Sequence, residues 1–309
     1  MSKRNVILGL GIIIIISMMV SALFSSSFTG KGSSGEKVAV IYIEGPIMGG
    51  TSRESLMGSG HCNTDVVIKQ IRSAKDDLSV KAVVLRINSP GGSAPASQEI
   101  TEEIIKLKNS GKPVVASMGD TAASGAYWIA SASDKIYANP ATLTGSIGVY
   151  ISSANLEELY QKIGYKPEIF KSGPYKDILS SDRPITPEER AIIQSMIEDI
   201  YSQFIDVIAQ GRNFDYEKAK SLADGRIYTG RQAKEVGLVD ELGNMYDAID
   251  GAAQLAGIKG EPEIVEYKDK SPISMLLGNV GDVRLNNILK REIKEHFLNE
   301  MFLMMPNPS

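Results

Sequence analysis

The chain has 309 residues, 43% of them hydrophobic and 23% charged, as expected for a folded globular protein with a sizeable core. Three of the 33 basic residues and none of the 37 acidic ones precede residue 32, so the remainder carries a net charge of −7, which argues against a nucleic-acid partner. The single cysteine, Cys62, excludes an internal disulfide. The adjacent His61 has no second cluster of metal ligands to join, so we expect no metal site.

The first segment predicts a membrane anchor. Lys3 and Arg4 precede a mostly apolar run of 19 residues, Val6 to Phe24, and a helix of that length would span about 28 Å, close to the hydrocarbon core of a bilayer. The run is longer than the apolar region of a cleaved signal peptide, which is the alternative, and no clean Ala-x-Ala site follows it. The basic pair predicts a cytoplasmic N-terminus, so we expect a single-pass cell-membrane protein with its remainder outside the cytoplasm.

Four parts follow from composition. Residues 1–25 hold the anchor, 26–37 form a flexible Gly/Ser linker, 38–260 form one folded domain, and 261–309 form a C-terminal extension with an apolar tail. In the folded domain, the predicted strands are "KVAVIYIEGPI", "VKAVVLRIN", "KPVVASMGD" and "KIYANP". They alternate with the predicted helices "TDVVIKQIRSAKDD", "ASQEITEEIIKLKNSG" and "TAASGAYWIASASD". This rhythm predicts an α/β fold with a mostly parallel sheet.

The second half of the domain is more helical. "TPEERAIIQSMIEDIYSQFIDVIAQGR" predicts a long helix with Thr186 as N-cap, Pro187 in the first turn and Glu189 at the third position. Its apolar residues recur at three- and four-residue spacing. Before it, "YKPEIF" (residues 165–170) predicts an apolar strand that leads into a Gly-Pro loop.

Two loops that follow predicted strands carry the candidate chemistry. Ligands of parallel sheets bind beyond the carboxyl ends of the strands. In "NSPGGS", Gly91 and Gly92 let backbone N–H groups point into a cleft, as one half of an oxyanion hole would require. In "GDTAASGAY", Ser124 could be a nucleophile, with the N–H of Gly125 as the other half. Each loop alone is more typical of a tight turn or close helix packing; together they favour a serine nucleophile.

A nucleophilic serine needs a general base. His61 lies in a Gly/Ser-rich loop and His296 in a charged tail segment; each position is typical of a solvated residue, although spacing does not exclude a Ser-His-Asp triad. A serine–lysine pair is the known alternative, and its lysine must be neutral near the working pH. The loop "FKSGPYKDI" offers Lys171 and Lys176, and composition does not choose between them.

Four stretches in order, "INSPGGS", "GDTAASGAYWIASASDKIYANPATLTGSIGV", "FKSGPYKDILS" and "GRIYTGRQAKEVGLVDELG", resemble the signal peptide peptidase A family. The resemblance covers Val38 to Gly257. Members are membrane-anchored serine peptidases of the Clp protease/crotonase-like fold, so it implies repeated ββα units with mostly parallel sheets. Residues 38–260 would then be the peptidase domain.

Carried onto this sequence, the resemblance places the nucleophile at Ser124 and the general base at Lys176, 52 residues later. It places the oxyanion hole at Gly91 and Gly125, with Gly92 as a substitute for Gly91. Ser146, in "TGSIG", corresponds to a hydroxyl that holds the lysine in place.

Lys171 becomes a neighbour of the base, and Asp177 receives no role. Ala126 stands where many relatives have a second glycine. We expect the reaction to tolerate this difference, because the N–H that it needs is that of Gly125.

The implied function is an anchored serine endopeptidase with a Ser–Lys dyad. Its partners would be remnant signal peptides and other short apolar peptides, membrane lipid around the anchor, and further copies in a homo-oligomeric ring. Serine and lysine can come from neighbouring subunits in this family. We expect no cofactor. The alternatives are a regulatory peptidase acting on another membrane protein, a crotonase-like acyl-CoA enzyme and an inactive scaffold. The absence of Asp and Glu from "TAASGAYW" and "PGGSAPAS" disfavours the acyl-CoA enzyme, and the presence of both Ser124 and Lys176 disfavours the scaffold.

Overall fold

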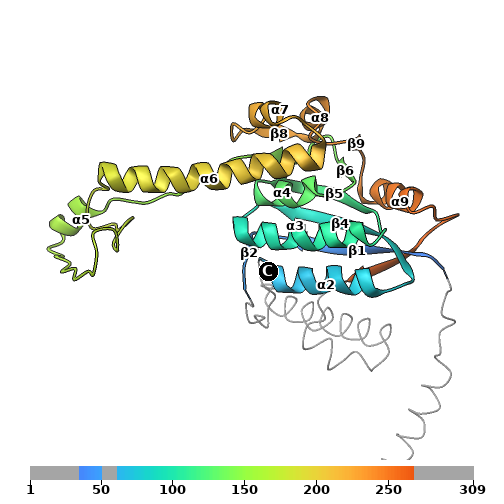
Figure 1. The fold of residues 1–309 in the computed structure, drawn as a ribbon, viewed down its shortest axis with the longest axis horizontal. Helices are drawn as coiled ribbons and strands as arrows, with labels where there is room; N and C mark the ends of the chain where they lie inside the picture. The colour runs from blue at the N-terminus through green and yellow to red at the C-terminus, as the bar shows by residue number, and fades with distance from the viewer. Residues whose placement is uncertain (1–34, 51–60, 268–309) are drawn as a thin grey trace, which may run out of the picture. The chain divides into compact units, whose positions relative to one another are not determined.

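A mostly parallel sheet forms the centre of the protein (Figure 1). The computed structural model describes residues 35–50 and 61–267. The main path through the sheet runs β10-β1-β4-β5-β6-β9, and every neighbouring pair on it is parallel. The six strands are β1 (Lys37–Glu44), β4 (Val80–Ser89), β5 (Val114–Ala123), β6 (Lys135–Ala138), β9 (Glu241–Leu242) and β10 (Glu263–Tyr267).

In the part of the chain that the structure describes, four short strands lie off this path. The end of β5 also pairs in parallel with β7 (Leu143–Gly145), and β7 pairs antiparallel with β8 (Ile227–Thr229). A separate parallel pair joins β2 (Ile47–Met48) to β3 (Cys62–Asn63). The predicted α/β class with a mostly parallel sheet is therefore confirmed. Because β10 pairs with β1, the sheet also includes residues beyond Gly260.

Helices cover both faces of the sheet. In β1, Val38 and Val40 pack with α9 (Met245–Leu255) on one face. Ala39 and Ile41 belong to the larger cluster on the other face. That cluster includes side chains of α2 (Thr64–Asp76), α3 (Ala94–Asn109) and α4 (Gly125–Ser131). Successive strand residues point to opposite faces, so burial on both faces explains why the strands read as continuous apolar runs.

The long helix α6 (Pro187–Arg212) begins as predicted. Thr186 Oγ accepts the Glu189 N–H, and the Glu189 carboxylate accepts the Thr186 N–H, which completes a capping box. Near its other end, Phe204 stacks on Trp128 of α4 with ring centroids 4.8 Å apart. The first half of α6 extends beyond the sheet together with α5 (Glu157–Lys162) (Figure 1). We call residues 150–200 the arm.

Two local predictions were wrong. In "TAASGAYWIASASD", residues 121–123 belong to β5 because they pair with β7, and the helix α4 starts only at Gly125. "YKPEIF" forms no strand, and Phe170 at its end is 91% exposed. Pro167 offers no N–H, and no strand lies beside this segment within the described residues.

Several predictions concern residues that are not described. These are the anchor at Val6–Phe24, most of the linker 26–37, and residues 268–309 of the C-terminal extension, which include His296. Among the helices of residues 35–50 and 61–267, none has the length and apolar content to cross a bilayer. The remaining helices of the described ranges, α7 (Tyr216–Ser221) and α8 (Gly230–Glu235), are short and follow α6.

Candidate active site

Ser124 occupies the sharp turn between β5 and α4. Its backbone angles are φ 53° and ψ −125°, which non-glycine residues rarely adopt. Two hydrogen bonds fix this turn: the Ser124 N–H donates to the Gly145 carbonyl (2.8 Å), and the Ser124 carbonyl accepts the Trp128 N–H (3.0 Å). A strained strand-to-helix turn that carries a serine at its tip is the geometry of a nucleophile elbow.

The loop after β4 lies directly against this turn. Gly91 has φ 98°, and a Cβ added there would lie 2.7 Å from the Ala123 carbonyl oxygen and 2.8 Å from both the Gly125 nitrogen and the Ser124 Cβ. Real Cβ atoms do not approach that closely, so only glycine fits. The predicted pairing of the Pro-Gly-Gly loop with the serine loop is therefore present in the structure.

The two glycine amides of this loop differ in their surroundings. The Gly91 N–H donates to Ser89 Oγ at 3.1 Å. The Ile47 N–H donates to the Gly91 carbonyl and the Ser93 N–H to the Ile47 carbonyl, both at 2.9 Å. In this parallel bridge the backbone groups of Gly92 point away from Ile47. They face Gly125, where an added Cβ would lie 3.3 Å from the Gly92 nitrogen.

A cavity of about 850 Å³ opens over Ser124. Its lining includes three of the predicted site residues, Gly91, Ser124 and Ser146, together with Gly92. The rest of the lining comes from the loop after β4 (Pro90), the loop after β7 (Gly148, Val149 and Tyr150), α6 (Tyr201) and the loop before β8 (Ala223, Asp224 and Gly225). Ser146, like Ser124, has a positive φ, of 50°, and its N–H donates to the Arg226 carbonyl (2.8 Å).

The structure does not bring Lys176 to this cavity. Lys176 lies exposed in the loop between α5 and α6. The next residue, Asp177, is joined through Arg183 to Glu189 in the first turn of α6, and Figure 1 shows that this end of α6 is remote from α4. The 15 residues of α6 from Glu189 to Phe204 rise about 22 Å along the helix. That span is several times the roughly 3 Å of a hydrogen bond. Within one chain, Ser124 and Lys176 are therefore apart. His61 does not line the cavity either.

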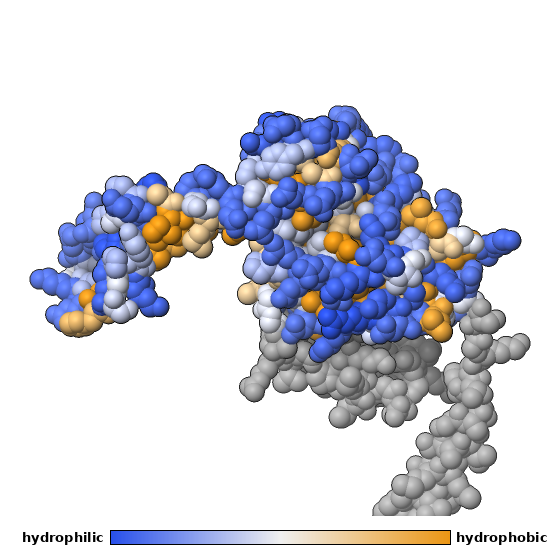
Figure 2. Space-filling model, in the orientation of Figure 1, coloured by the Kyte–Doolittle hydropathy of each residue, from blue (hydrophilic) through white to orange (hydrophobic). Residues whose placement is uncertain are grey.

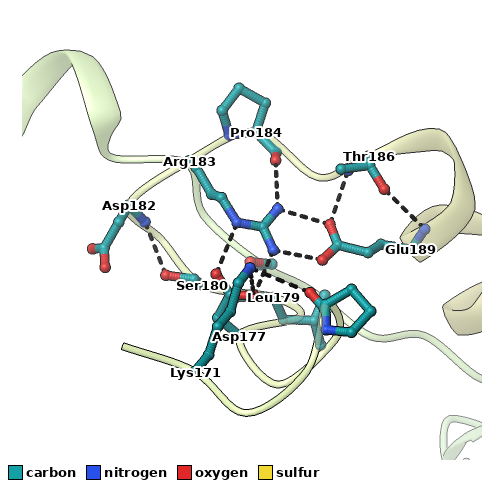
Figure 3. A network of polar contacts seen from close by, with 11 residues as sticks. Lys171, Asp177, Leu179, Ser180, Asp182, Arg183, Pro184, Thr186 and Glu189 are labelled. Atoms are coloured by element: carbon teal, nitrogen blue, oxygen red, sulfur yellow. Dashed lines mark hydrogen bonds and ion pairs between the residues drawn. The ribbon is translucent and has the colours of Figure 1, made fainter. Parts of the chain in front are cut away.

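Charged side chains surround the Lys176 loop (Figure 3). The Asp177 carboxylate accepts hydrogen bonds from Lys171 (2.8 Å) and from the Arg183 guanidinium, whose Nε lies 3.0 Å away. Arg183 also binds Glu189. These contacts, Arg183 first, hold the pKa of the Asp177 carboxyl well below its usual range. Arg183 and then the Thr186 N–H lower the pKa of Glu189 from 4.5 to about 2.

This network was missed from the sequence. The sequence predicts Glu189 only as a capping residue, and no motif in it includes Arg183. The one available signal was the even spacing of opposite charges, with Asp177, Arg183 and Glu189 each six residues apart.

Comparisons with known proteins show what the chain is similar to. The family model described as peptidase family S49 matches residues 106–259. A Synechocystis protein named "Putative protease slr0021" is 42% identical over 261 residues, 84% of this chain and 88% of its own. An Enterococcus faecium protein named "Putative signal peptide peptidase SppA" is 38% identical over 251 residues, 81% of this chain and 72% of its own.

"Protease 4" of Salmonella typhi is 40% identical over 263 residues, which are 84% of this chain and 41% of that longer protein. The matched regions of all three relatives cover most of the domain that carries Ser124 and its glycine loops. The chain is a peptidase that belongs to family S49, the signal peptide peptidase A family.

Proposed function

We propose that this peptidase is a membrane-anchored serine endopeptidase with Ser124 as nucleophile and Lys176 as general base. The observation that carries the proposal is the strained turn at Ser124, which opens into the cavity beside the Pro-Gly-Gly loop. Strain of this kind persists only where the surrounding structure imposes it, and it concentrates at active sites.

The chemistry follows from the groups around Ser124. Neutral Lys176 takes the Ser124 Oγ proton while the oxygen attacks the peptide carbonyl. The Gly125 N–H and one amide of the Pro-Gly-Gly loop stabilise the oxyanion. The resemblance assigns that second amide to Gly91, but the Gly91 N–H is already bonded to Ser89. Gly92 is exposed and faces Gly125, which favours it as the donor.

The acyl-enzyme is then resolved by the same groups. Lys176 passes its proton to the leaving amine and afterwards activates a water molecule, which hydrolyses the ester on Ser124. Ser146 lines the same cavity, where its hydroxyl would hold the lysine amine that enters.

Because Lys176 lies far from Ser124 of its own chain, we assign each active site to two subunits. A head-to-tail contact that repeats around an axis closes into a ring. The arm offers apolar surface for this contact (Figure 2). Its exposed apolar side chains include Tyr150, Leu159, Ile163, Tyr165, Phe170, Ile192 and Met196. Exposed apolar area of this extent is typical of an interaction surface.

The substrates we propose are remnant signal peptides and other short apolar peptides. Val149, Tyr201 and Ala223 give the cavity apolar wall, and about 850 Å³ accommodates several side chains of an extended peptide. One relative is itself named as a signal peptide peptidase. An anchor at Val6–Phe24 would keep the site on the outer face of the membrane, where such peptides remain.

The test combines labelling with two alanine variants. A fluorophosphonate probe should label the wild-type protein, and Ser124→Ala should remove both the label and the cleavage of a synthetic signal peptide. Lys176→Ala should abolish cleavage, whereas Lys166→Ala, which removes another exposed lysine of the arm, should leave it unchanged. Near-normal cleavage by Lys176→Ala would reject the dyad, and labelling that survives Ser124→Ala would reject the nucleophile.

A further inference from the structure

The loop that carries Lys176 is tied to the start of α6 by three side chains, which we call the clamp: Asp177, Arg183 and Glu189. The Arg183 Nε and Nη2 donate to Asp177 at 3.0 and 2.9 Å, and Nη1 and Nη2 donate to Glu189 at 2.8 and 2.5 Å. Nη1 also donates to the Pro184 carbonyl at 3.1 Å. A guanidinium has five N–H donors, so all of its donor capacity is used.

The two carboxylates of the clamp are shielded although they lie in an exposed arm, and the Arg183 side chain between them is 27% exposed. The side chains of Asp177 and Glu189 are only 11% and 2% exposed. Glu189 is also held by the capping box, in which it accepts the Thr186 N–H at 3.0 Å. Bidentate carboxylate–guanidinium pairs are short and fix orientation. The clamp therefore joins the loop to the first turn of α6.

Lys176 itself takes no part in the clamp. Its side chain is exposed. Its backbone N–H donates to the Gly173 carbonyl at 3.3 Å. Lys171, in the same loop, donates a hydrogen bond to Asp177 at 2.8 Å, so the loop folds back on itself beside the clamp. The clamp (Figure 3) thus orders the backbone on either side of Asp177, the residue that follows Lys176, and within the described residues no hydrogen bond or ion pair holds the Lys176 amine.

The other end of α6 is fixed to the nucleophile. The Phe204 ring stacks on the Trp128 ring, and the backbone N–H of Trp128 donates to the Ser124 carbonyl at 3.0 Å. A straight path of packed and hydrogen-bonded groups therefore runs from Ser124 through α6 to the clamp. It sets the separation between the serine and the lysine of one chain, and hence the spacing at which a neighbouring copy must sit.

We propose that Arg183 and Asp177 are positioning residues, which hold the Lys176 amine at the reach required by Ser124 of the neighbouring subunit. This inference rests on the proposed function. The structure predicts a separation of kinetic effects. The cavity over Ser124 contains none of the clamp residues, so loss of the clamp should spare peptide binding and impair proton transfer. A displacement of about 1 Å can lower a rate by about 100-fold.

The experiment compares Arg183→Gln and Asp177→Asn in the full chain. We expect kcat to fall by about 10- to 100-fold, with KM within about twofold of wild type. Arg183→Lys should not restore kcat, because an ammonium cannot bind two carboxylates as a planar fork does. Arg183→Gln leaves the Asp177 carboxylate without its main partner, whereas Asp177→Asn leaves Lys171 without its ion-pair partner, so the two variants unbalance charges of opposite sign near Lys176. Equal losses in both variants therefore cannot come from an unpaired charge of one sign.

The matched control is Arg190→Gln. Arg190 is exposed on α6, one residue after the clamp, and within residues 61–267 its guanidinium has no hydrogen bond or ion pair. It should keep wild-type kcat. Particle mass, measured on every variant, should be unchanged.

Two results would overturn the inference. One is a wild-type kcat in Arg183→Gln or Asp177→Asn. The other is a loss of activity that accompanies dissociation into monomers, which would make the clamp an assembly device. Lys176→Ala separates the two levels of the account. If it is inactive while Arg183→Gln is fully active, only the clamp fails; if Lys176→Ala is active, the proposed dyad fails.

Discussion

The strain at Ser124 makes a prediction about stability as well as activity. Its φ of 53° with ψ of −125° is accessible to glycine at little cost, whereas it costs other residues about 1–3 kcal/mol. Ser124→Gly should relieve that strain. Glycine also has more conformational entropy in the unfolded chain, and this cancels about 0.5–1 kcal/mol of the stability gained by relieving the strain. The expected net effect is a gain of about 0.5–2 kcal/mol relative to Ser124→Ala.

Ser124→Ala is the proper reference because it also lacks the hydroxyl but keeps the Cβ and its strain. Ser73→Gly against Ser73→Ala supplies the control, since Ser73 is an exposed residue inside α2. At that position the glycine variant should be less stable than the alanine variant by about 1 kcal/mol. The difference in free energy of unfolding between the glycine and alanine variants should therefore have opposite signs at Ser124 and Ser73.

Urea unfolding at one fixed protein concentration would measure these differences, since assembly makes stability depend on concentration. In a thermal scan, each 1 kcal/mol corresponds to about 2–4 °C for a domain of this size. If Ser124→Gly is no more stable than Ser124→Ala, while Ser73 behaves as expected, the turn stores no strain and that argument for a nucleophile elbow fails.

Three further predictions test the site and its support. Gly91→Ala should lose nearly all peptide cleavage, because the new Cβ would lie 2.8 Å from the Ser124 Cβ; a variant with normal kcat would contradict the tight packing of the two loops. Phe204→Ala should lower the free energy of unfolding by about 3–5 kcal/mol, since it empties a buried site against Trp128; urea unfolding measures this, and a loss under 1 kcal/mol would contradict it. Hydrogen bonds from Arg72, and then from Lys106, lower the pKa of the Glu103 carboxyl from 4.5 to about 2. Its stabilising effect is therefore present above pH 4.5 and is lost as the pH falls toward 2. The free energy of unfolding, measured in urea at pH 5 and at pH 3, should fall less in Glu103→Gln than in wild type. Equal falls would contradict a stabilising role for the Glu103 carboxylate.

The sequence was sufficient for the four neighbouring strands β1, β4, β5 and β6 and for the start of α6, but it did not predict the strands β7, β8, β9 and β10 of the same sheet. Alternation of β-branched runs with amphipathic helices defined the parallel core, because burial on both faces leaves a plain pattern. The capping box was readable from Thr186 and Glu189 alone, since its hydrogen bonds are local. Local rules fixed these features, and the structure confirms them.

Pairing partners decided the features that the sequence did not reveal. Residues 121–123 are small and fit strand or helix equally well, and their pairing with β7 made them strand. The apolar run at 165–170 found no strand beside it within the described residues, so it stayed irregular. The charge spacing that could have marked Arg183 becomes meaningful only when the loop folds back on α6.

The sequence predicted only part of the arrangement of the candidate site. Ser124 and its two glycine loops are brought together by strand order, which the sequence pattern implied. The separation of Ser124 from Lys176 depends on the direction in which α6 leaves the sheet, and no pattern of residues encodes that directly. The motif order alone gave no indication that one chain holds the two groups apart.

The most direct test of the central claim is complementation between two inactive variants. Ser124→Ala and Lys176→Ala, co-expressed in equal amounts, would assemble at random into mixed rings. A site made of serine from one subunit and lysine from the next would be intact in about a quarter of cases. We predict about one quarter of the wild-type cleavage rate from the mixture and none from either variant alone. No cleavage from mixed assemblies of normal size would contradict an active site shared between subunits.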